Sequence, residues 1–375
     1  MNQNRMRGKA RFVVQACGRI AAVLGLLVAG QASAESDPAL VAAARAEGRV
    51  TVYSVLSNKA AQPLLADFKA AYPGIEVDYD GDKGSNEMDL RYRSETAAGA
   101  ATADVVWSSA MDMQMKLVAD GFAVPYRSPE ASGLPAWANY RDVAFATTQE
   151  PLVIVYNRNL VAPADVPRDH AALTALLNRE ATALNGKVTS FDIDKSGVGY
   201  MLAAQDSLAN PAEAKLLAAF ARVGLRQSGG TGDMLSGINN GTFLLGYNMM
   251  GAYALSRSRK DLPALGIVFP ADYTLVLSRV AFVSKRAAHP NAARLWLDYL
   301  LSARGQKVLG DAIELYPIRE GVDARYTAAQ LRQAIGKGIR PVPMDMTLAA
   351  MMGPPTRDRI LAAWHKATAQ HGNAQ

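Results

Sequence analysis

Hydrophobic and polar positions follow two different periods along the chain, and the first third shows both. Runs rich in β-branched or apolar residues at 50–55, 75–80 and 103–107 predict three strands, the last buried on both faces. Apolar residues recur at helical spacing between 58 and 72, and a second helix is expected from about 85 to 99. A methionine-rich helix is predicted at 111–118, with its methionines as core residues.

The same alternation resumes after an apolar strand predicted at 152–156. Helices are expected at 171–178, 200–208, 212–223, 234–240 and 291–301, and strands at 186–191, 243–247, 266–269 and 273–283. Strands that alternate with helices indicate an α/β protein with parallel sheets wound by helices. The length allows two such domains.

Small polar residues follow four of the predicted strands. In such sheets ligands bind beyond the carboxyl ends of the strands, where helix N-termini offer free N–H groups. Any one of these residues is also a common helix cap. The prediction of a ligand site therefore depends on the presence of such residues at four strand ends. The candidate ligand-binding residues are Ser57, Asn58, Gly84, Ser85, Asn86, Ser108, Ser109, Ser196 and Gly197.

Three alternating aspartates, Asp78, Asp80 and Asp82, resemble the start of a calcium loop. Lys83 stands where that loop requires glycine, and Asp89 replaces the final glutamate. A strand precedes the acids where an EF-hand has a helix. We therefore interpret the stretch as a strand end and turn, and we predict no metal site there.

The first 34 residues have the order of a secretory signal peptide: a basic start, an apolar run at 20–29, and Ala32-Ser33-Ala34. An amphipathic helix of the mature fold is the alternative. Cleavage after Ala34 would remove five of the 40 cations and leave 35 against 34 acids, a net charge of +1. That balance offers little support for nucleic-acid binding. The single cysteine, Cys17, would leave too, so no disulfide or cysteine metal site is predicted.

Enzyme signatures are missing from the sequence. There is no G-x-S-x-G elbow, the stretch before Asn185-Gly186-Lys187 lacks the first glycine of a phosphate loop, and Gly230-Thr231-Gly232 lacks the third glycine of a dinucleotide loop. The four histidines are scattered without metal-ligand spacing. We predict neither catalytic residues nor a cofactor.

Ordered motifs across nearly the whole mature chain resemble bacterial solute-binding proteins of ABC importers. They are V-T-V-Y-S, A-D-V-V-W-S-S, A-D-G-F-A-V-P-Y, P-L-V-I-V-Y-N-R-N-L, S-G-V-G-Y, I-N-N-G-T-F-L-L-G-Y-N, the stretch from S-R-V-A-F-V-S-K to L-W-L-D-Y-L-L-S, and L-Y-P-I-R. The family in question includes proteins that bind ferric ion, thiamine, phosphonates and hexose phosphates.

The resemblance implies a two-lobed periplasmic-binding-protein fold of type II that closes around ligand at two crossover strands, expected near 148–155 and 273–282. Lobe one is then expected at 35–149 plus 278–325, and lobe two at 150–277 plus 326–375. The resemblance also implies a periplasmic protein that delivers a solute to an inner-membrane ABC permease, and we expect a monomer.

The nature of the solute stays open between an anion and a cation. Iron-binding relatives carry an adjacent tyrosine pair where this chain has Met249-Met250, and thioethers are poor ligands for ferric ion. A thiamine-like cation would need an aromatic sandwich, for which Trp107, Tyr247 and Tyr273 are the candidates. Tyr247, Asn248 and Tyr273 therefore join the candidate ligand-binding residues.

A small polar solute, phosphorylated or carboxylated, fits the strand ends better, and Lys83 would attract it. The alternatives are a ferric-ion or thiamine-like cation binding protein, a secreted hydrolase, and a ligand-binding input for a membrane sensor.

Overall fold

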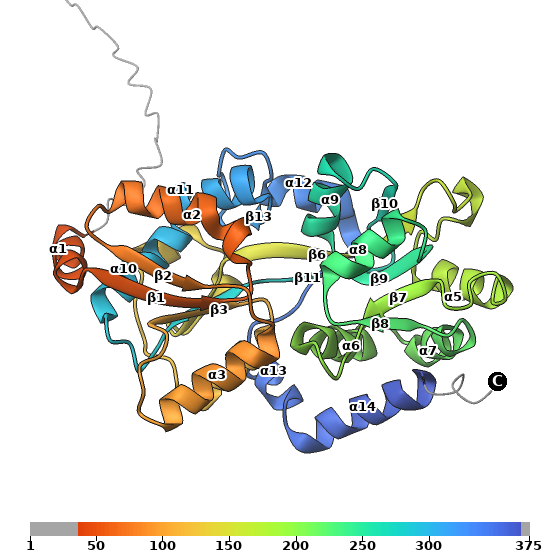
Figure 1. Cartoon of the computed structure of the whole chain (residues 1–375), viewed down its shortest axis with the longest axis horizontal. Coiled ribbons are helices and arrows are strands. Elements are labelled where there is room, and N and C mark those ends of the chain that lie inside the picture. Colours follow the sequence, from red (N-terminus) through yellow and green to blue (C-terminus); the bar gives the residue numbers. More distant parts are fainter. Residues whose placement is uncertain (1–36, 369–375) are drawn as a thin grey trace, which may run out of the picture. The chain divides into compact units, whose positions relative to one another are not determined.

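The computed structural model describes residues 37–368, so the expected signal peptide at 1–34 lies outside the described residues. None of the helices within this range is both long and apolar enough to cross a membrane. Two mixed sheets form the framework, each covered by helices (Figure 1). This arrangement confirms the α/β fold class.

The first sheet has the strand order β2-β1-β3-β12-β5-β4. Strand β1 pairs in parallel with β2 and β3, whereas β12 pairs antiparallel with both β3 and β5. The strands are β1 (Arg49–Ser54), β2 (Glu76–Asp80), β3 (Val105–Ser108), β4 (Asn139–Tyr140), β5 (Ala144–Ala146) and β12 (Val280–Val283). Its helices are α1 (Pro38–Glu47), α2 (Asn58–Ala71), α3 (Ser85–Ala97), α4 (Met111–Ala119) and α10 (Pro290–Leu301), with short turns η1 (Pro129–Gly133) and η2 (Ala136–Ala138).

The second sheet has the order β14-β11-β6-β9-β7-β8, with β10 and β13 also paired to β6. Strand β7 is parallel to β8 and β9, and β6 is antiparallel to β9, β10 and β11. The strands are β6 (Thr148–Asn157), β7 (Val188–Phe191), β8 (Arg226–Ser228), β9 (Leu245–Met250), β10 (Leu265–Val268), β11 (Thr274–Leu277), β13 (Tyr316–Pro317) and β14 (Ile339–Pro341). Its helices are α5 (His170–Arg179), α6 (Gly197–Ala209), α7 (Glu213–Arg222), α8 (Thr231–Asn239) and α9 (Gly251–Lys260), with the turn η3 (Pro163–Asp165).

Two segments lead from one sheet to the other. Strand β5 of the first sheet is followed after one residue by β6, and β11 of the second sheet is followed after two residues by β12. The two segments also contact each other, because β11 pairs antiparallel with β6. Both lie where the crossover strands were expected.

The C-terminal segment adds elements that the sequence analysis did not assign. They are α11 (Ala303–Val308), the π-helical turn η4 (Leu309–Ile313), α12 (Ala328–Ile335), η5 (Gly336–Gly338), α13 (Met346–Met351) and α14 (Pro354–Thr368). Helix α13 packs against α4, which follows a strand of the first sheet, whereas α14 packs against α6 and α7 near the second (Figure 1). The last helices therefore contact elements that follow strands of both sheets, and the expected lobe boundaries stay a prediction.

Most strands and helices lie within a few residues of their predicted places. The methionines of α4 are buried as predicted, with Met111 and Met115 fully inaccessible. The alternation predicted parallel pairing, which holds for β1 with β2 and β3 and for β7 with β8 and β9, but both sheets are mixed. The crossover strands enter each sheet antiparallel, a direction that hydrophobic periodicity does not report.

Candidate functional site

A cavity of about 420 Å³ lies beside the carboxyl ends of strands from both sheets. That volume is within the usual range for small-molecule sites. Residues that line it are Val55, Ser57, Lys83, Gly84, Ser85, Ser109, Phe191, Ser196, Val198, Gly229, Gly230, Thr231, Gly232, Leu235, Met250, Tyr253, Arg257 and Arg279.

Five helices begin at the cavity, because the residue that precedes each of them lines it. These N-cap residues are Ser57 of α2, Gly84 of α3, Ser196 of α6, Gly230 of α8 and Met250 of α9. The hydroxyls of Ser57 and Ser196 accept hydrogen bonds from their own helices, whereas α3, α8 and α9 have no side-chain cap. First-turn N–H groups of those three helices are therefore left for water or a ligand. Converging N-termini also favour negative charge in the cavity.

Arg279 is a buried cation in the wall of this cavity, with only 1% of its surface exposed. Its Nε lies 2.9 Å from Oε1 of Glu150, and its Nη2 donates to the hydroxyl of Tyr253 at 3.0 Å. Its Nη1 has no hydrogen-bond partner among the described residues. Burial alone would lower the pKa of Arg279, but the Glu150 carboxylate holds that pKa above its ordinary value. The side chain is therefore charged and has a donor to spare.

Two further cations line the cavity, and their acidic partners stand outside the lining. Arg257 pairs with Asp261 through its Nε at 2.7 Å, and Lys83 pairs with Asp80 at 2.9 Å. No aspartate or glutamate is found among the described residues that line the cavity. The wall that faces a ligand is therefore positive.

Five of the residues predicted from strand ends line the cavity together: Ser57, Gly84, Ser85, Ser109 and Ser196. One assignment changes in detail. Gly84, not Ser85 or Asn86, is the N-cap of α3, so Ser85 is the first residue of the helix and its hydroxyl is not needed as a cap. These five residues come from four separate segments between Ser57 and Ser196.

Four predicted residues lie next to the cavity but outside its lining, each held by the fold. Asn58 bonds to Asp82 and to the N–H of Gly81, and Ser108 is buried and accepts from the N–H of Ala110.

The other two of these four bring helices from the two sheets together. The Nδ2 of Asn86 on α3 donates to the backbone oxygen of Lys195, just before α6, at 2.8 Å. Gly197 begins α6, and a Cβ there would stand 2.8 Å from both Oδ1 of Asn86 and Oγ of Ser85. Glycine permits this close approach.

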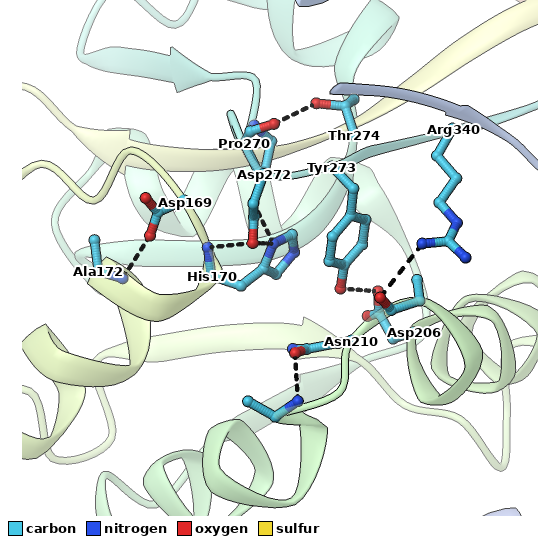
Figure 2. Close-up of polar contacts among 12 residues, drawn as sticks. Asp169, His170, Ala172, Asp206, Asn210, Pro270, Asp272, Tyr273, Thr274 and Arg340 are labelled. Carbon is cyan, nitrogen blue, oxygen red and sulfur yellow. Dashed lines mark hydrogen bonds and ion pairs between the residues drawn. The ribbon is translucent and has the colours of Figure 1, made fainter. Parts of the chain in front are cut away.

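The predicted residues Tyr247, Asn248 and Tyr273 do not line the cavity. All three donate hydrogen bonds to the buried carboxylate of Asp206 on α6. Figure 2 shows the bond from Tyr273, whose ring stacks on that of His170 at 4.0 Å. Burial raises the pKa of Asp206, although these three donors oppose the shift. These hydrogen bonds connect β9 and the residue before β11 to α6.

The aspartates that resemble a calcium loop are occupied by protein partners. Asp80 forms ion pairs with Lys83 and Arg91, Asp82 accepts from Asn58, and Asp89 pairs with Arg93. Their oxygens contribute to the fold of β2 and α3.

Sequence reasoning missed two arginines and a glycine-rich turn of the cavity. Arg279 could have been found as the single cation inside the apolar run 273–283, because a buried charge needs a partner. The turn at 229–232 follows β8 and begins α8, three residues before the predicted start of that helix. It was set aside because it fails the dinucleotide pattern. Arg257, on an amphipathic helix with several other cations, gave no distinguishing signal.

Comparisons with known proteins agree with this geometry. The family model for bacterial extracellular solute-binding protein matches residues 54–307. The crystal structure of the substrate binding protein of the ABC transporter from Agrobacterium tumefaciens is 32% identical, with a TM-score of 0.80 over 85% of this chain and 94% of that chain. No curated protein sequence matches the chain.

More distant structures share the fold. Apo ferric ion-binding protein A from Pasteurella haemolytica is 18% identical, with a TM-score of 0.69 over 87% of this chain and 100% of that chain. The periplasmic binding protein AfuA from Actinobacillus pleuropneumoniae, solved with fructose-6-phosphate, is also 18% identical, with a TM-score of 0.68 over 86% and 99% of the two chains. The resemblance seen in the sequence motifs is thus confirmed. The chain belongs to the bacterial extracellular solute-binding proteins and has the fold of an ABC-transporter substrate-binding protein.

Proposed function

We propose that the protein captures a small organic anion in the cavity around Arg279 and delivers it to an ABC permease of the inner membrane. The observation that carries this proposal is the buried, charged guanidinium of Arg279, whose Nη1 has no partner among the described residues. Buried charges are normally paired and hydrogen-bonded in full. A bound oxyanion that reaches this buried guanidinium would supply a partner for Nη1.

The surroundings of Arg279 support an anion over a cation. Lys83 and Arg257 add positive charge, and the uncapped N-termini of α3 and α8 add N–H donors. A cation would meet repulsion from three like charges and no acid in the described lining.

The alternatives from the sequence find less support in this cavity. Trp107, Tyr247 and Tyr273 lie outside the lining, so they form no aromatic sandwich there. Met249 is fully buried and Met250 presents a thioether, a poor ligand for ferric ion. A secreted hydrolase would need a base beside a nucleophile, and no histidine or carboxylate accompanies the serines among the described lining residues. A sensor input would share the fold.

The remaining expectations belong to the same proposal. We expect a periplasmic monomer, released after removal of residues 1–34, that binds no nucleic acid and catalyses no reaction. Lobe one would comprise 35–149 plus 278–325, and lobe two 150–277 plus 326–375. The family of extracellular solute-binding proteins supports the periplasmic location.

A thermal-shift screen tests the class of ligand. The purified protein is melted with inorganic phosphate, sugar phosphates, phosphonates, carboxylates, thiamine, polyamines and Fe(III). An anion present at 100 times its Kd should add about 2.7 kcal/mol of stability, because it binds only the folded state. A shift with Fe(III) or thiamine and none with any anion would refute the proposal, and turnover of a phosphate ester would favour the hydrolase.

Two arginines on α9 provide a matched pair of variants. Arg257 lines the cavity, whereas Arg259 pairs with Glu314 and does not. Arg257→Gln should weaken binding of the anion about tenfold, since a charge-assisted hydrogen bond contributes about 1.5–3 kcal/mol. Arg259→Gln removes the same charge from the same helix and should leave Kd nearly unchanged. Equal effects of the two variants would mean that the anion does not bind at this cavity.

A further inference from the structure

Several side chains on the cavity wall can donate hydrogen bonds to a ligand. The hydroxyls of Ser57 and Ser196 already accept from the N–H groups of Ala60 and Gly199, so each has its proton free to donate into the cavity. Arg279, Arg257 and Lys83 donate only, as do the free N–H groups at the helix starts. A ligand that satisfies this wall must be rich in acceptor oxygens.

Acceptors are correspondingly scarce on the same wall. Within the described part of the chain, the lining contains no aspartate, glutamate, asparagine, glutamine or histidine. The acceptors left are backbone carbonyls and the hydroxyl oxygens of serine, threonine and Tyr253, of which the Tyr253 oxygen already accepts from Arg279. A ligand amine would lack a counter-charge, and each hydroxyl of a sugar would lack a side-chain carboxylate or amide to receive its proton.

The rest of the wall is apolar. Phe191 and Val198, at the end of β7 and the start of α6, join Leu235 of α8, Met250 and Val55 in the lining. All but Val55 are buried side chains. Such a surface gains free energy from an apolar partner and none from a hydroxylated one.

We infer that the solute is an oxyanion with an apolar body: a phosphate ester, phosphonate or carboxylate whose carbon skeleton bears no amino group and few or no hydroxyls. This inference rests on the proposed function, since it places the anionic group at Arg279 and the body against Phe191, Val198 and Leu235. Zwitterionic amino acids, amines and hydroxyl-rich sugar phosphates are thereby disfavoured.

Isothermal titration calorimetry with matched probes tests the apolar body of the ligand separately from its anionic group, which we call the head. Phenyl phosphate and glucose 6-phosphate share a head and differ in the body, inorganic phosphate is the head alone, benzoate replaces phosphate by carboxylate, and phenethylamine is an apolar cation. We expect phenyl phosphate or benzoate to bind at least tenfold more tightly than glucose 6-phosphate, and phenethylamine not to bind.

The other outcomes separate the two claims. Equal or tighter binding of glucose 6-phosphate would overturn the apolar body and leave the anion proposal standing. Binding of phenethylamine in preference to the anions, or no binding by any anion, would overturn both.

A near-isosteric variant tests whether the apolar wall causes the preference for phenyl phosphate over glucose 6-phosphate. Val198→Thr places a hydroxyl in the lining and should reduce the ratio of the Kd values for glucose 6-phosphate and phenyl phosphate at least threefold, with little change for inorganic phosphate. Val161→Thr makes the same change at a buried position outside the cavity and should leave the ratio unchanged. An unaltered ratio in the folded Val198→Thr protein would contradict the inference.

Discussion

Two buried aspartates illustrate how local surroundings decide the state of a carboxyl group. Asp206 receives three hydrogen bonds from side chains, whereas Asp112 on α4 has a backbone N–H at Oδ1 and no partner at Oδ2 among the described residues. Burial raises the pKa of Asp112 to about 7. In the unfolded chain this group ionises near pH 4. Between these values only the folded protein holds the proton, so the contribution of Asp112 to stability falls as pH rises from about 4 to 7.

Asp112→Asn should therefore stabilise the protein at pH 8 and flatten the pH dependence of its unfolding. The gain should be about 2 kcal/mol or more, since each pKa unit corresponds to about 1.4 kcal/mol, and it should shrink toward pH 4. Urea denaturation at pH 4, 6 and 8 measures the difference from wild type. A difference that does not vary with pH would contradict the assignment.

Asp206→Asn is the control, with the opposite sign expected. An amide cannot accept from all three of Tyr247, Asn248 and Tyr273, because its Nδ2 would face a donor. We expect a loss of about 1–3 kcal/mol at pH 8 in the same denaturation series. A stabilised variant would mean that Asp206 is not an ionised acceptor.

At the residue scale, the sequence predicts several of the small polar residues that line the cavity and misses two of its three cations. Ser57, Ser85 and Ser196 were found because a hydroxyl after a strand has a recognisable role at a helix start. Tyr247 and Tyr273 were predicted to bind ligand because they are aromatic. Their hydroxyls donate hydrogen bonds to Asp206. Which way a side chain points depends on strand pairing and bulges, such as the register shift between β6 and β9, and these are not visible in periodicity.

At the scale of elements, α3 and α6 are in contact at their N-termini, where Gly197 meets Ser85 and Asn86. A Cβ at Gly197 would also lie 2.6 Å from Cε of Met113. Gly197→Ala should push the two helices apart and lower anion affinity about tenfold, because an added methyl in a tight contact costs about 1–3 kcal/mol. Calorimetric titration gives Kd, and the melting temperature without ligand reports whether the fold is kept. An unchanged Kd would show that this contact does not shape the site.

Most helices and strands up to α10 were predictable because alternating periods and punctuating polar residues mark them, whereas α1, α9, β4, β5 and β8 were not predicted. The segment after α10 was not predictable, since its short helices and the two- and three-residue strands β13 and β14 are set by contacts with β6, β11, α4 and α6. Tertiary contacts decide such short elements more than local propensity does.

For the whole molecule, the position of Arg279 would link ligand binding to movement if the proposed anion binds there. Arg279 lies between β11 and β12 in one crossover segment, and its partner Glu150 lies on β6 in the other. An anion at Arg279 therefore contacts the expected hinge directly, and the ligand can favour one arrangement of the hinge over another.

Small-angle X-ray scattering tests this consequence. Saturation with an anion that calorimetry shows to bind should lower the radius of gyration, because the cavity walls close around the ligand. The Arg279→Lys protein at the same anion concentration should show a smaller decrease, because its higher Kd leaves a smaller fraction of the molecules liganded. A radius of gyration that stays constant at proven saturation would mean that binding does not close the molecule.

The most direct measurement of the central claim is the Kd of a bound anion for the wild type and for Arg279→Lys, by isothermal titration calorimetry. Lysine keeps the charge but lacks the planar fork that pairs with Glu150 and offers Nη1 to the ligand. The control is Arg319→Lys, a largely buried arginine that pairs with Glu130 and does not line the cavity. We predict at least a tenfold rise in Kd for Arg279→Lys and none for Arg319→Lys. An unchanged Kd in Arg279→Lys would contradict the assignment of this cavity as the anion site.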